Sequence, residues 1–113
     1  MHEYSIVQAL LEQAAAEARR HGARSVHRLT VTVGELSGVE ATLLATAYET
    51  FREGTVCAGA PLEIRAVKAR WQCPWCERTL ERGAVLECPR CARPARLTDG
   101  DEIVLETLEL EVP

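Results

Sequence analysis

Apolar residues recur along the first twenty positions at the spacing of one helix face. Between residues 3 and 20 they fall at i, i+3, i+4, i+7 and i+11. Basic residues close this stretch, where they suit the negative end of a helix dipole, and the following Gly22 can stop a helix. The pattern predicts an amphipathic helix over residues 3–20. Its apolar face consists of Val7, Leu10, Leu11, Ala14 and Ala18.

A strict alternation replaces the helical spacing over residues 27–33. Leu29, Val31 and Val33 fall on one face of an extended chain. Arg28, Thr30 and Thr32 fall on the other face. Such alternation is typical of a strand with one face buried and one face in water.

A second apolar stripe predicts a second helix after this strand. Ser37 and Glu40 stand three residues apart, which is the spacing of a capping box at a helix start. The helix is expected to end near Gly54. Its apolar positions are Leu44, Ala47, Tyr48 and Phe51.

Two further stretches alternate. Pro61 precedes the first of them, in which Leu62, Ile64 and Ala66 share a face. The second runs over residues 102–112, and its alternation changes phase near Glu106. A change of phase within one strand indicates a bulge or a bend.

The order of these elements predicts an α+β fold. A strand, a helix and a strand joined by short connections form a right-handed parallel pair, and the last strand is expected to return antiparallel. The result is a mixed three-stranded sheet with two helices on one face, plus a small zinc-ribbon-like module inserted before the last strand. The 113 residues suit one domain with an appendage. We expect an α/β domain over residues 1–70 with 102–113, and a metal-binding module over residues 71–101.

This topology also predicts where candidate metal ligands lie. Both helices begin at one end of the sheet, and the second strand of the parallel pair leads toward that same end. His2, Glu3, Glu40 and the cysteines of the inserted module are therefore expected to share one edge of the molecule.

Charge and composition narrow the class of protein. Apolar residues make up 47% of the chain, but no run approaches the roughly 20 needed to span a membrane. The first residues do not resemble a signal peptide, so we expect a cytoplasmic protein. Residues 68–96 hold seven basic and three acidic side chains, a net charge of +4, which leaves −8 on the rest of the chain. Such a segment can dock an acidic partner or nucleic acid, or it is simply a solvated surface.

Four of the five cysteines form two C-x-x-C pairs separated by eleven residues: Cys73 with Cys76, and Cys88 with Cys91. Two such turns facing each other supply tetrahedral sulfur to zinc, with no open position for catalysis. The spacing therefore predicts a structural zinc site, ahead of a redox dithiol or another metal. Cys57 has no partner at ligand spacing and is interpreted as a buried, inert thiol.

The first three residues offer a second candidate metal site. A terminal amine on Met1, the amide after it and the imidazole of His2 place several nitrogens in succession, an arrangement favoured by nickel(II) and copper(II). The positive end of a helix dipole disfavours a bare cation, so anionic support from Glu3 or Glu40 is needed. Both glutamates are also ordinary residues for a helix start. The other histidines, His21 and His27, are interpreted as structural or solvated.

The chain resembles the HypA/HybF family of nickel metallochaperones over essentially its whole length. The resemblance rests on "MHEYSIVQALLEQA", "VGELSGVE", "YETFREGTVCAGAPLEI" and the paired C-x-x-C motifs, in this order. It implies nickel(II) binding at the Met-His-Glu start, here Met1, His2 and Glu3, and structural zinc on the four paired cysteines. An acidic residue at the position of Glu40 joins the nickel site in some relatives, although aspartate is the residue we associate with that position.

The resemblance also implies partners: a HypB-type GTPase and the precursor of the nickel–iron hydrogenase large subunit, with urease maturation served by some members. It implies no enzymatic activity and no membrane or nucleic-acid partner. Two features depart from the family pattern. The gap between the cysteine pairs is slightly short, and no histidine stands beside the cysteines.

A zinc-ribbon module that binds nucleic acid is the competing interpretation. The basic segment and the aromatic residues Trp71 and Trp75 favour it, because bases stack on exposed rings. The acidic remainder of the chain and its isoelectric point of about 5.4 disfavour it. An enzyme is disfavoured because no nucleophile–base arrangement and no phosphate-binding loop can be identified.

Overall fold

The computed structural model describes residues 2–80, 88 and 90–113, with no description of the His2 side chain. The chain begins with α1 (His2–Arg20), close to the predicted bounds. It continues through β1 (Ser25–Gly34), α2 (Ala41–Phe51), β2 (Leu62–Val67), β3 (Arg70–Gln72), β4 (Thr79–Leu80), β5 (Arg96–Asp99) and β6 (Ile103–Glu111).

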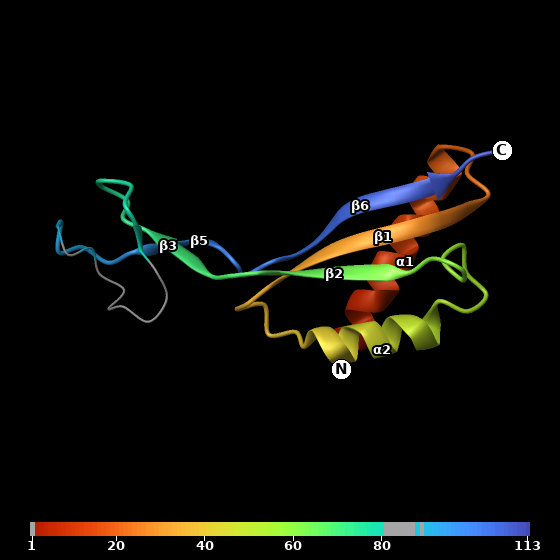
Figure 1. The fold of residues 1–113 in the computed structure, drawn as a ribbon, viewed down its shortest axis with the longest axis horizontal. Helices are drawn as coiled ribbons and strands as arrows, with labels where there is room; N and C mark the ends of the chain where they lie inside the picture. Colours follow the sequence, from red (N-terminus) through yellow and green to blue (C-terminus); the bar gives the residue numbers. More distant parts are fainter. Residues whose placement is uncertain (1, 81–87, 89) are drawn as a thin grey trace.

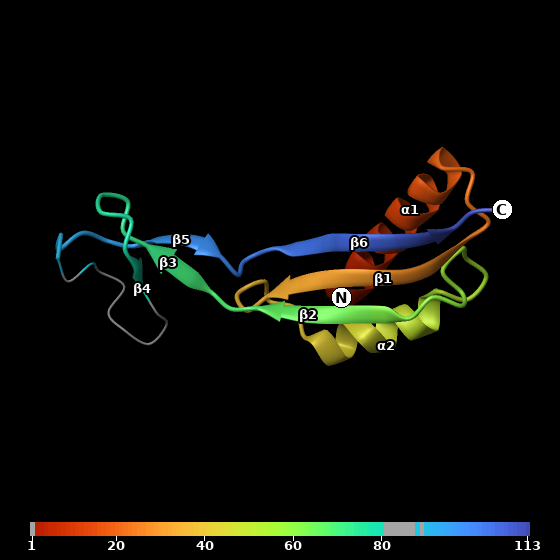
Figure 2. The ribbon, with the colours of Figure 1, turned by 45° about the horizontal axis from the view of Figure 1, so that its top comes forward.

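The larger sheet has the predicted mixed topology, with strand order β2-β1-β6. β1 and β2 are parallel and are joined through α2, whereas β6 returns antiparallel to β1. The two helices lie on the same side of this sheet (Figures 1 and 2). We call the two helices and this sheet the body.

One apolar core joins the sheet to both helices. Leu29 and Val31 of β1 are fully buried, while their neighbours in sequence point to the other face, as the alternation predicts. Burying a Val or Leu side chain completely contributes roughly 1.5–3 kcal/mol, so this cluster accounts for much of the stability of the body. Its buried members are Val7, Leu10, Leu11, Ala14, Val26, Leu29, Val31, Val33, Leu44, Tyr48, Cys57 and Ala60.

The opposite face of the sheet is polar and carries a bulge. Thr30 pairs with Thr107 and the next residue of β1 pairs with Leu105, so Glu106 is the extra residue. This confirms the change of phase predicted there. The Glu106 carboxylate lies 2.8 Å from a guanidinium nitrogen of Arg65 on β2.

The predicted capping box at the start of α2 is wrong. The helix begins at Ala41, so its N-cap is Glu40, which has extended torsions and makes no side-chain capping bond. Gly38 has a φ of +78°, which is incompatible with a right-handed helix. A helix therefore cannot start at Ser37 and continue through Gly38. The Ser37 hydroxyl accepts a hydrogen bond from the nearby Val39 N–H instead, at 3.3 Å.

Two positions predicted to be buried are exposed. Ala66 lies near the end of β2, where the strand leads away from the helices (Figure 2). Phe51 ends α2 with 42% of its surface exposed, and its ring rests against the ring of Tyr4 at 4.4 Å between centroids.

A second small sheet, with strand order β4-β3-β5, extends from the body along the long axis (Figures 1 and 2). We call residues 70–99 the cysteine module. The radius of gyration is 17.8 Å, well above the roughly 13 Å of a compact chain of this length. The inserted module therefore makes the molecule elongated, with a longest extent of 56 Å.

Three backbone segments cross where the module joins the body, a crossing that we call the neck. A Cβ added to Gly34 would lie 2.3 Å from the carbonyl carbon of Gly100, and one added to Gly100 would lie 2.5 Å from the Cα of Ala69. The Gly34 N–H donates to the Glu102 carbonyl at 2.8 Å, and the Leu36 N–H donates to the Gly100 carbonyl at 2.7 Å. The neck therefore requires glycine for close backbone approach.

Glu35 forms hydrogen bonds to the segment of the neck that leads from β2 into the cysteine module. Its backbone N–H donates to the Val67 carbonyl and its carboxylate accepts the Ala69 N–H, both at 2.8 Å. The turn after β1 is thus bonded to both segments that lead into and out of the cysteine module.

Candidate metal sites

The two C-x-x-C turns fold in the same way. In each, the N–H of the first cysteine donates to the carbonyl five residues later, and the N–H four residues later donates back to the cysteine carbonyl. For Cys73 the partners are Arg78 and Glu77, and for Cys88 they are Arg93 and Ala92, with all four bonds at 2.8–2.9 Å. We call these turns the first and second knuckle.

Each knuckle contains a residue in the left-handed region. Glu77 has a φ of 60° and Ala92 a φ of 54°, and both stand four residues after the first cysteine of their turn. Side chains other than glycine adopt this region at a cost. The common spacing is visible in the sequence, but neither residue type signals the conformation, so the sequence analysis missed it.

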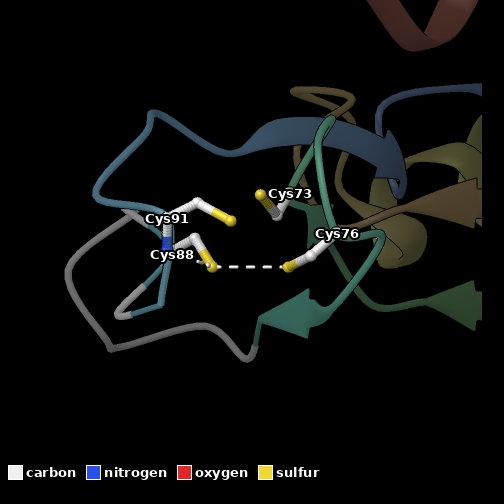
Figure 3. A group of neighbouring side chains, drawn as sticks. All are labelled: Cys73, Cys76, Cys88 and Cys91. Carbon is white, nitrogen blue, oxygen red and sulfur yellow. Dashed lines mark hydrogen bonds between the residues drawn. The ribbon is translucent and has the colours of Figure 1, made fainter.

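The knuckles bring the four sulfurs together (Figure 3). All four lie within 4.8 Å of one another, and the Cys76 and Cys88 sulfurs are 3.6 Å apart. Four sulfurs at about 2.3 Å from one zinc ion would be about 3.8 Å apart, whereas a disulfide bond is about 2.05 Å long. The spacing therefore fits a tetrahedral metal site and not a pair of disulfides.

Hydrogen bonds prepare part of this cluster for metal binding. The backbone N–H of Cys76 lowers the pKa of the Cys73 thiol to about 6, and the N–H of Cys91 likewise lowers the pKa of Cys88. Desolvation raises the pKa of Cys91 to about 12. Since a thiolate is the form that binds metal, Cys73 is ready at neutral pH and Cys91 must lose its proton on binding.

Cys57 belongs to the core of the body. It is fully buried, and burial raises the pKa of its thiol, which favours the unreactive protonated form. The prediction of a buried thiol is confirmed. Beside it, the Tyr48 hydroxyl donates to the Ala60 carbonyl at 2.7 Å.

The amino-terminal candidate site lies mostly outside the described residues. Met1 and the side chain of His2 are not described, while the backbone of His2 begins α1. Glu3 is half-buried and lines an apolar hollow of about 440 Å³ between α1 and α2. Tyr4, Leu43 and Phe51 form its exposed apolar wall.

Glu40 is the N-cap residue that precedes α2, and it is exposed. Among the residues that the structure describes, the four paired cysteines are the group whose potential ligand atoms converge, and neither glutamate belongs to it. Both helices begin at the end of the body that faces the cysteine module, as the topology predicts. The small sheet that carries the paired cysteines, however, lies beyond these helix starts along the long axis, so the helix starts and the cysteine module do not share an edge (Figure 1).

None of the helices that the structure describes is both long enough and apolar enough to cross a membrane.

Comparisons with known proteins agree with this architecture. The family model described as "Hydrogenase/urease nickel incorporation, metallochaperone, hypA" matches residues 1–110. The hydrogenase maturation factor HypA of Aquifex aeolicus is 40% identical over 99% of both chains. That of Helicobacter hepaticus is 34% identical over 99% of this chain and 98% of its own.

Two solved structures share the fold. The solution structure of the nickel metallochaperone HypA from Helicobacter pylori is 31% identical, with a TM-score of 0.74 over 98% of both chains. A second solution structure, of a HypA protein, is 33% identical, with a TM-score of 0.81 over 97% of this chain and 96% of its own. The chain belongs to the HypA family, the nickel metallochaperones of hydrogenase maturation.

Proposed function

We propose that this protein carries nickel(II) and delivers it to the precursor of the nickel–iron hydrogenase large subunit, with urease as a second recipient. The observation that carries the proposal is the match of the family model from residue 1, which includes the Met-His-Glu start. The protein acts as a carrier in the cytoplasm and not as an enzyme, and neither membrane nor nucleic acid is its partner.

Nickel is bound at the start of α1. The Met1 amine, the following amide and the His2 imidazole supply nitrogen ligands, and Glu3 supplies negative charge close to the positive end of the helix dipole. Glu40 is the candidate for a further ligand from α2. A site with so few ligands releases its cargo by ligand exchange with a partner, and acid weakens binding because protons compete for the same nitrogens.

Zinc is held by Cys73, Cys76, Cys88 and Cys91, a set that the converging sulfurs support. With four thiolates no coordination position stays open, so the ion cross-links the two knuckles and stabilises the module. We assign nickel binding to a domain of residues 1–70 with 102–113, and zinc binding to a module of residues 71–101.

The partners proposed are a HypB-type GTPase and the hydrogenase large subunit precursor. Their assignment rests on family membership, because the family serves nickel incorporation.

Nickel titration by calorimetry tests the proposal. We expect His2→Ala to weaken nickel binding at least tenfold, and His27→Ala, which removes an exposed imidazole from β1, to leave it unchanged. A residue added ahead of Met1 should have the same effect as His2→Ala, since it displaces the terminal amine. Equal affinity in the wild type, His2→Ala and the extended chain would contradict the nickel site.

A further inference from the structure

Trp75 is the most exposed large apolar residue among those described, with 65% of its surface in water. It stands in the first knuckle, between Cys73 and Cys76. The guanidinium of Arg93 lies over its ring, 4.3 Å from the ring centroid. Arg93 ends the second knuckle, so this pair bridges the two turns. Metal binding by the four cysteines does not require this contact between Trp75 and Arg93.

Most arginines of the body form ion pairs, whereas the basic residues described in the module do not. In the body, Arg20, Arg28, Arg52 and Arg65 each form an ion pair with a glutamate. No ion pair with a described carboxylate is formed by the basic residues described in and just before the module: Lys68, Arg70, Arg78, Arg90, Arg93 and Arg96. Among its described residues, the module therefore presents positive charge that no ion pair neutralises, next to an exposed ring.

Stacking leaves Arg93 available for a further partner. A guanidinium over an aromatic face keeps the N–H groups at its edge free to donate to a carboxylate. Trp and Arg are also the residue types that most often dominate binding energy at protein interfaces. Such a pair suits a carboxylate that is presented next to an apolar side chain.

Charge distribution favours a protein over a nucleic acid as the partner. The segment 68–96 carries +4, while the rest of the chain carries −8. A long polyanion would be repelled by the body, whereas a short acidic segment of a protein can meet the module alone.

We propose that Trp75 and Arg93, together with the exposed Arg78 and Arg90 of the same two knuckles, form a docking surface for an acidic segment of a partner protein that also presents an apolar side chain. The inference deepens the proposed function and rests on it, because it names the surface that holds a partner while nickel is transferred. The surface is formed by both knuckles, so it is assembled only when metal closes them.

Fluorescence anisotropy with a labelled synthetic 15-residue peptide tests this surface. The peptide contains Asp and Glu around a central Leu, and a matched peptide carries Asn and Gln in their place. We expect the acidic peptide to bind the zinc-loaded full-length protein at least tenfold more tightly than the amide peptide, and less tightly as salt rises. A single-stranded DNA oligonucleotide of the same length serves as the other class of partner.

Trp75→Ala and Arg93→Ala should each weaken acidic-peptide binding at least fivefold while keeping one zinc per chain and wild-type nickel affinity. Arg24→Ala removes an exposed charge from the body and should change nothing. Unchanged peptide binding in Trp75→Ala, equal binding after zinc chelation, or tighter binding of DNA than of peptide would each overturn the inference. Loss of nickel binding by His2→Ala is read separately, so the docking surface and the nickel proposal can fail independently.

Discussion

The body and the cysteine module reach a folded state by different means. The body buries a continuous set of aliphatic side chains between a sheet and two helices. In the module, the buried residues among those described are the cysteines Cys73 and Cys88 together with Leu80. Too little apolar surface is removed from water there to offset the entropy of ordering the chain. The comparison indicates that the core stabilises the body and that the metal stabilises the module.

Removing zinc should produce the largest effect, confined to the module. Structural zinc contributes roughly 10 kcal/mol of binding free energy that is also folding free energy. After chelation we expect backbone NMR signals of β3, β4 and β5 to collapse to unfolded positions while those of β1 and α1 persist. Cys73→Ser should do the same, because it removes a ligand.

Cys57→Ala is the matched control for that experiment. It removes a cysteine from the body, and one zinc per chain should be retained. Loss of the signals of the body together with those of the module would contradict the comparison, as would no loss at all.

Truncating a core side chain should destabilise the body and leave the module folded. Leu29 is fully buried in the central strand, and Leu29→Ala should lower the free energy of unfolding of the body by about 2–5 kcal/mol. Chemical denaturation measures this loss, and zinc content by elemental analysis should not change. Leu43→Ala on the exposed face of α2 should cost less than about 1 kcal/mol, and an equal loss in both variants would argue against the core as the source of stability.

The neck connects the two regions, and filling it should disturb their relative orientation. Gly34→Ala places a methyl group 2.3 Å from the Gly100 carbonyl carbon, where backbone must move, at a cost of about 1–3 kcal/mol. Residual dipolar couplings should show that the module and the body no longer share one alignment. Gly59→Ala, with open space around the added methyl group, should leave the couplings unchanged.

The same division separates what the sequence could predict from what it could not. The body follows from periodicity, and even the bulge at Glu106 shows as a change of phase. The capping box failed because Gly38 turns the chain before α2, a backbone effect that the Ser37–Glu40 spacing does not reveal. The paired cysteines were identifiable from spacing alone, because a tetrahedral site needs that geometry.

The small sheet and the neck could not be predicted in this way. β3, β4 and β5 span two to four residues, too few for alternation to show. The neck depends on Gly34, Ala69 and Gly100, which lie far apart in the sequence and meet only in the folded chain. The stacking of Trp75 on Arg93 likewise depends on the closed knuckles.

The pH dependence of zinc binding should show whether the first knuckle stays folded without metal. In the folded knuckle the pKa of Cys73 is about 6 against an ordinary 9.0, so above pH 6 its sulfur is a thiolate and protons no longer compete with zinc for it. Its stabilising hydrogen bonds act fully above pH 9 and are lost as the pH falls through 6. Cys91, with a pKa of about 12, releases a proton on zinc binding at every pH between 5 and 8.

Chelator competition between pH 5 and 8 measures this dependence. Because we expect the metal-free module to be unfolded, its thiols then have an ordinary pKa of roughly 8.5, and the slope of log affinity against pH should stay constant through pH 6. A slope that steepens by about one proton below pH 6 would show instead that the first knuckle stays folded without metal and keeps the low pKa of Cys73.

The smallest expected effect comes from the left-handed residues of the knuckles. Ala92 has a φ of 54°, a conformation that costs a residue with a Cβ about 1–2 kcal/mol, whereas glycine gives back about 0.5–1 kcal/mol in unfolded-state entropy. Ala92→Gly should therefore tighten zinc binding by at most about tenfold in chelator competition, without changing the unfolding of the body. Ala58→Gly, at an exposed position of the body, should leave zinc affinity unaltered. Weaker zinc binding in Ala92→Gly would mean that the knuckle does not hold this residue in the left-handed region when metal is bound.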